Sequence, residues 1–63
     1  MIELRYEDKT GNRMFGFMLP PDVAKDVATS SMQRPECKGA EMVTTPAGIT
    51  VIINNEAFWE AHR

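Results

Sequence analysis

The side chains with the most reactive chemistry are one thiol and one imidazole. Cys37 lies between Glu36 and Lys38, and the lysine cation could lower the thiol pKa and favour a nucleophile. Nucleophilic catalysis also needs a base within hydrogen-bond reach, and the only histidine, His62, is the penultimate residue. Glu36 opposes thiolate formation because like charges repel. We therefore expect Cys37 to be an ordinary loop residue and the protein not to be an enzyme.

Carboxylates, metal ligands and glycines offer no stronger site. Glu3 and Glu7 lie on one face of a predicted strand, but an acid–base pair needs a cleft that so short a chain cannot easily build. Cys37 and His62 are the only cysteine and the only histidine, too few for a zinc site built from these two residue types. The 4 glycines are scattered and form no phosphate-binding loop. We expect no metal and no cofactor.

An aromatic segment suggests nucleic-acid binding as an alternative. Residues 13–18 read Arg-Met-Phe-Gly-Phe-Met and resemble the aromatic octapeptide of the RNA-recognition motif family, although Met14, Met18 and Pro20 depart from it. That family stacks bases on aromatic rings of an open sheet, so the resemblance implies a single-stranded nucleic-acid binder. The residues concerned are Arg5, Arg13, Phe15 and Phe17. Burial of both rings in a core is the competing interpretation, and it agrees with the net charge of −2.

Apolar residues outside the predicted core favour a protein partner instead. We expect Met14 and Met18 to face solvent, and Ile52 to join them because its strand is apolar on both faces. A monomer rarely exposes a large apolar patch, so a partner or a second copy would cover this face. In the alternative, the segment containing Phe58 and Trp59 folds back over it. The Trp59 indole is a large anchor in either case.

Composition limits what the chain can be. It has 63 residues, 43% hydrophobic and 25% charged, which predicts one domain over residues 1–63. The net charge of −2 argues against a general nucleic-acid binder. A single cysteine excludes an internal disulfide, so we expect self-association as a homodimer to contribute stability. The sequence contains no apolar segment long enough for a signal peptide or a membrane span. We therefore expect a cytoplasmic protein without membrane contact.

Local patterns predict two hairpins separated by a helix. Strands are expected where apolar residues alternate or β-branched residues cluster, and turns where proline, glycine and asparagine gather. Proline and Asp22 favour a helix start, and Pro35 ends that helix. The predicted order is strand 1–7, turn 8–12, strand 13–19, a helix from Pro20-Pro21-Asp22, loop 34–39, strand 40–44, turn 45–48, strand 49–53, and a helix 56–62 capped by Asn54 or Asn55.

This order predicts a two-layer ββαββ fold of the α+β class. We expect an antiparallel sheet with the main helix on one face, through Val23, Ala24, Val27, Ala28 and Ser31, and with a short C-terminal helix. The opposite face of the sheet is left for water, for a second copy or for a partner.

The register of the first hairpin decides which side chains reach that face. A four-residue loop pairs Glu7 with Asn12 and places Leu4 opposite Phe15, so both phenylalanines are buried beneath the helix. A three-residue loop pairs Glu7 with Arg13 and reverses the faces of the second strand. We favour the first register because fully burying one phenylalanine contributes about 1.5–3 kcal/mol.

Together these patterns predict a small non-enzymatic protein-binding module. Its size suits an adaptor or an inhibitor, such as an accessory protein of a phage or mobile element. The expected binding residues are Met14, Met18, Ile52, Phe58 and Trp59.

Overall fold

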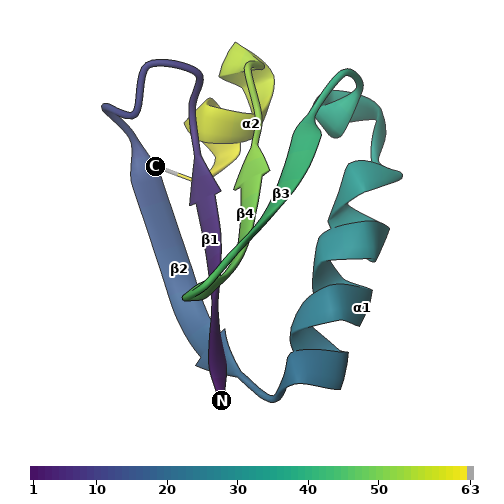
Figure 1. Ribbon diagram of the computed structural model, residues 1–63. Helices are drawn as coiled ribbons and strands as arrows, with labels where there is room; N and C mark the ends of the chain where they lie inside the picture. Colours follow the sequence, from purple (N-terminus) through teal and green to yellow (C-terminus); the bar gives the residue numbers. More distant parts are fainter. Residues whose placement is uncertain (63) are drawn as a thin grey trace.

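A computed structural model describes residues 1–62. The strands are β1 (Ile2–Glu7), β2 (Met14–Leu19), β3 (Glu41–Thr45) and β4 (Gly48–Ile52). The helices are α1 (Pro21–Met32), the short 3₁₀ turn η1 (Pro35–Cys37) and α2 (Glu56–Ala61). The predicted ββαββ order and the C-terminal helix are confirmed, and the fold is α+β (Figure 1). No helix among these residues is both long enough and apolar enough to cross a bilayer.

The four strands form one mixed sheet in the order β2-β1-β4-β3. Both hairpins are antiparallel, but the two central strands, β1 and β4, run parallel. The prediction of a wholly antiparallel sheet is therefore wrong at the centre. The reason is topological: α1 carries the chain from one edge strand, β2, to the other, β3, so the second hairpin returns with β4 beside β1 in the same direction.

The first hairpin differs from its predicted register by two residues. Glu7 pairs with Met14, and Leu4 pairs with Phe17 rather than Phe15. The Asp8 carboxylate lengthens the loop because it accepts hydrogen bonds from the Asn12 N–H (3.0 Å) and the Thr10 hydroxyl (2.9 Å). A displacement of two residues preserves the side-chain faces, so the predicted division of the hairpin into two faces is correct while its cross-strand pairs are not.

Helix α1 lies over β4, β1 and β3 rather than over β2. Ala24 and Ala28 form its buried stripe, and their small side chains let the helix approach the sheet closely. The expectation that the helix buries both phenylalanines is wrong for Phe17. Val23 is 41% exposed and Phe17 is 48% exposed, because β2 extends beyond the area that the helix covers.

The core lies between the sheet and both helices. Tyr6 shows that the helices share one face, because its hydroxyl lies 2.6 Å from the Ser31 hydroxyl on α1 while its ring packs against Phe58 on α2. Asn55 caps α2 as predicted, with its side chain accepting from the Ala57 N–H at 2.8 Å. The buried hydrophobic residues are Leu4, Tyr6, Ala24, Ala28, Cys37, Val51, Ile53, Phe58 and Trp59.

Candidate protein-binding surface

The sheet has one face covered by helices and one that no helix in residues 1–62 covers. We call the second the helix-free face. Because side chains alternate along each strand, the registers define its members. They are Glu3, Arg5 and Glu7 on β1; Met14, Gly16 and Met18 on β2; Gly48, Thr50 and Ile52 on β4; and Glu41, Val43 and Thr45 on β3.

Apolar side chains occupy both flanks of the helix-free face. Met14 and Met18 are 52% and 57% exposed on β2. Val43 on β3 is exposed and Ile52 on β4 is half-buried. Three of the five predicted binding residues, Met14, Met18 and Ile52, are thus brought to one face. A flexible methionine adapts to the shape of a partner surface, which makes this face suitable for a protein contact.

Charged side chains run between these apolar flanks along β1. The Arg5 guanidinium donates to a Glu3 carboxylate oxygen at 3.0 Å, so these two charges offset each other. Glu7 and, on β3, Glu41 add two further carboxylates. The strand residues of the helix-free face therefore hold three carboxylates and one guanidinium. Such a surface complements apolar groups flanked by basic ones.

The predicted aromatic anchor lies elsewhere. Phe58 and Trp59 are buried in the core on the opposite face of the sheet, where the Trp59 indole N–H donates to the Ile53 carbonyl at 2.8 Å. The rings of Phe58 and Phe15 lie 6.2 Å apart. The C-terminal segment does fold back onto the sheet, but onto its helix-covered face. Neither side chain is therefore available to a partner in this structure.

The four residues of the nucleic-acid hypothesis do not share a surface. Arg5 lies on the helix-free face, whereas Phe15 and Phe17 point to the helix-covered face. Phe15 is half-buried between the rings of Tyr6 (5.0 Å) and His62 (5.5 Å). The positions that would present stacked rings on an open sheet carry Met14, Gly16 and Met18 here. The resemblance in sequence is therefore not accompanied by a similar arrangement of side chains.

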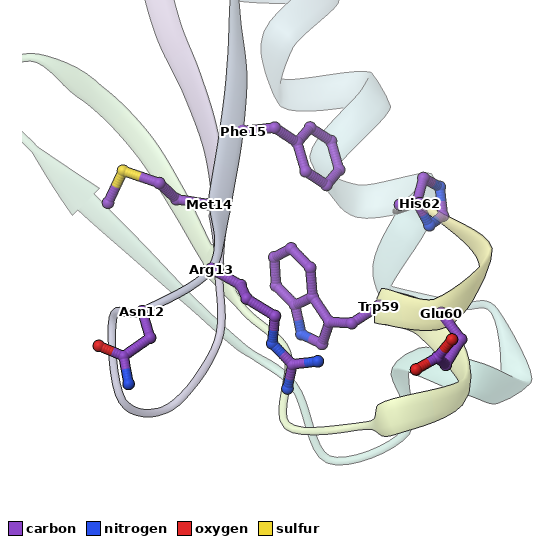
Figure 2. Close-up of a pocket in the computed structure, with 7 residues that line it drawn as sticks. All are labelled: Asn12, Arg13, Met14, Phe15, Trp59, Glu60 and His62. Atoms are coloured by element: carbon purple, nitrogen blue, oxygen red, sulfur yellow. The ribbon is translucent and has the colours of Figure 1, made fainter.

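A pocket of about 480 Å³ lies at the end of the sheet where the β1–β2 loop meets α2 (Figure 2). Arg13 forms its polar wall: the guanidinium donates to both Glu56 carboxylate oxygens, at 2.7 and 3.2 Å, and to Asp8 at 3.0 Å. It also lies 5.5 Å from the centre of the Trp59 ring. These contacts engage Arg13 with the protein's own groups, so the arginine fastens the loop to α2 rather than offering a free cation to a ligand.

The same contacts shift three pKa values. Desolvation by itself would raise the pKa of Asp8, but hydrogen bonds from Arg13, Thr10 and the backbone lower it to about 2. Glu56 and then Asp8 raise the pKa of Arg13. The Arg13 guanidinium in turn lowers the pKa of Glu56. All three groups therefore favour their charged forms in the folded protein.

The candidate reactive groups, Cys37 and His62, both contact neighbouring groups of the fold. Cys37 is 1% exposed, and burial followed by the nearby Glu36 carboxylate raises the pKa of its thiol. The predicted loop cysteine is therefore a core residue. The His62 ring lies against Phe58, and its Nδ1 is 2.8 Å from the Phe58 carbonyl oxygen. In the part of the chain that is described, no three His, Cys, Asp or Glu side chains cluster as metal ligands.

The sequence patterns missed Val43 and the Arg13 network. Val43 stands between Met42 and Thr44, and only the β3–β4 register reveals that it shares a face with Ile52. Arg13 and Glu56 are 43 residues apart, so no local signal connects them. Comparison of the chain with protein-family models, with curated proteins and with solved structures finds no match in any of the three.

Proposed function

We propose that this protein is a small non-enzymatic binding module that recognises a partner protein through its helix-free face. The observation that carries the proposal is the arrangement of that face: exposed Met14, Met18 and Val43 flank a row of charged residues. Such a surface offers apolar contact area together with orienting charges. An adaptor or an inhibitor needs no more than this.

The charges on this face favour a particular kind of partner. Three carboxylates against one arginine would attract a surface that presents lysine or arginine beside apolar side chains. Electrostatic complementarity of this sort mainly orients the encounter, while the methionines and Ile52 supply the buried contact. The expected partner is therefore a protein with a basic, partly apolar surface.

Affinity capture from the native host with two matched variants tests this function. Val43 on the helix-free face and Val23 on α1 are both 41% exposed, so Val43→Lys and Val23→Lys differ mainly in the side of the molecule they alter. We expect the wild-type protein and Val23→Lys to capture the same proteins, and Val43→Lys to lose them. Circular dichroism confirms that both variants fold.

Nuclease treatment before capture separates the two functional hypotheses. Under the proposal, the captured proteins are unchanged by nuclease. Loss of the captured material after nuclease treatment, or equal capture by Val43→Lys and the wild-type protein, would contradict the proposal.

A further inference from the structure

The outer edge of β2 lacks the features with which proteins usually protect a strand edge. Within residues 1–62, β2 pairs only with β1, and its six residues are Met-Phe-Gly-Phe-Met-Leu, without a charge or a proline. Edge strands are commonly protected by charged residues, prolines or bulges. The other edge strand, β3, carries Glu41 and two threonines. The β1–β2 ladder has no bulge across all six pairs, so the β2 edge is regular along its whole length.

The phase of the ladder shows which backbone groups of β2 point outward. The Asp8 N–H donates to the Arg13 carbonyl at 3.0 Å, at the end of the hairpin. Since bonded and non-bonded pairs alternate in an antiparallel ladder, Phe15 and Phe17 direct their backbone groups to β1. The N–H and C=O groups of Met14, Gly16 and Met18 therefore point to the free edge.

The sequence of this edge is palindromic, and its central residue is one of those whose backbone groups point to the free edge. Residues 14–18 read Met-Phe-Gly-Phe-Met in both directions, with Gly16 at the centre. We propose that two copies of the chain pair antiparallel along β2, with Gly16 facing its equivalent on a twofold axis. Met14 then lies opposite Met18 of the second copy, and Phe15 lies opposite Phe17. The outward backbone groups fall on the residues that this register requires to be hydrogen-bonded.

This pairing also accounts for the exposed side chains of β2. Phe17 is 48% exposed in the single copy, and in the pair it gains Phe15 of the second copy as a neighbour across the strands. No charged residue lies between positions 14 and 19, so self-pairing places no like charges opposite each other. Pairing along one strand edge buries little surface area compared with specific interfaces, which bury roughly 1,200–2,000 Å². We therefore expect a concentration-dependent equilibrium between monomer and dimer.

The pairing would join two sheets into one and place two helix-free faces side by side. Each face would remain open, so the inference stands or falls independently of the proposed function. Its tests measure self-association of the purified protein and need no partner.

Paired charges at Met14 and Met18 test the register. Met14→Lys with Met18→Lys would place like charges opposite each other twice across the axis, whereas Met14→Lys with Met18→Glu would place opposite charges there. Met14 and Met18 neighbour Glu7 and Glu3 within the same copy, which favours folding of the double-lysine variant.

By sedimentation velocity up to millimolar concentration, we expect the wild-type protein to dimerise. The double-lysine variant should have a dissociation constant at least about tenfold above that of the lysine–glutamate variant. Equal association of the two variants, or a wild-type protein that stays monomeric, would refute the pairing.

Disulfide trapping provides a second measurement. Opposed residues in such a ladder have Cα atoms about 5.5 Å apart, within disulfide range, whereas positions 14 and 18 are separated by about 13 Å along the strand. A mixture of Met14→Cys and Met18→Cys proteins should therefore cross-link under mild oxidation, and neither protein alone should. The native Cys37 is buried and serves as an unreactive background. Cross-linking of either variant alone to the same extent as the mixture would exclude this register.

Discussion

The contrast between two phenylalanines on β2 gives the sharpest test of how the core is built. Phe15 is half-buried and its ring lies 5.0 Å from Tyr6, 6.2 Å from Phe58 and 5.8 Å from Trp59. Phe17 is 48% exposed, and its ring contacts are with Tyr6 at 6.5 Å and Phe15 at 5.9 Å. Truncation of the two rings to alanine should therefore have unequal costs.

The expected magnitudes follow from burial. Replacing a core phenylalanine with alanine costs about 3–5 kcal/mol, and the half-burial of Phe15 places Phe15→Ala near about 3 kcal/mol. About half of Phe17 is already in water, so Phe17→Ala should cost about 1–2 kcal/mol. A domain of this size has a total stability of only about 3–9 kcal/mol. Phe15→Ala should thus remove at least about a third of the total stability, whereas Phe17→Ala should remove a smaller part of it.

Urea and thermal unfolding followed by far-ultraviolet circular dichroism measure both costs. Each kcal/mol should lower the melting temperature by about 4–8 °C in a domain of this size. The measurements belong at low micromolar concentration, where pairing along β2 does not add to the burial of Phe17. If Phe17→Ala costs as much as Phe15→Ala under these conditions, the position assigned to α1 over β4, β1 and β3 is incorrect.

Three further predictions concern acid, a thiol and a glycine. The pKa of Asp8 is lowered from 3.8 to about 2 in the folded protein. The contribution of the Asp8 carboxylate to stability is therefore complete above pH 3.8 and is lost as the pH falls through 2. In urea unfolding measured across this pH range, Asp8→Asn should make the free energy of unfolding fall less steeply with decreasing pH. Cys37→Ser should cost about 1–3 kcal/mol in the same assay because it places a hydroxyl in the core, and an unchanged midpoint would contradict the burial of the thiol. Gly48 has a φ of 153°, and a Cβ there would overlap the Glu3 carbonyl oxygen. Gly48→Ala should therefore lower the melting temperature more than Gly11→Ala, where φ is 79° and the space is open; equal shifts would argue against the close approach of β4 to β1.

Local chemistry in the sequence determined the elements and their order. Proline at the start of α1, Asn55 at the cap of α2 and alternation along β1 act over a few residues, so a single sequence reveals them. Alternation also determined the faces of the first hairpin. Met14 and Met18 fall on one side and the two phenylalanines on the other in any register displaced by an even number of residues.

The sequence pattern also indicated which face of the first hairpin points to the core, but tertiary structure alone decided how completely each of its side chains is buried. The parallel pairing of β1 with β4, the position of α1 away from β2, and the burial of Cys37 and Trp59 depend on contacts between residues far apart in the chain. Their free energies are set by the packing of the whole molecule, and no short pattern encodes them. Even the loop of the first hairpin depends on distant contacts, because Arg13 binds both Asp8 within the loop and Glu56 on α2, which lies 43 residues after Arg13.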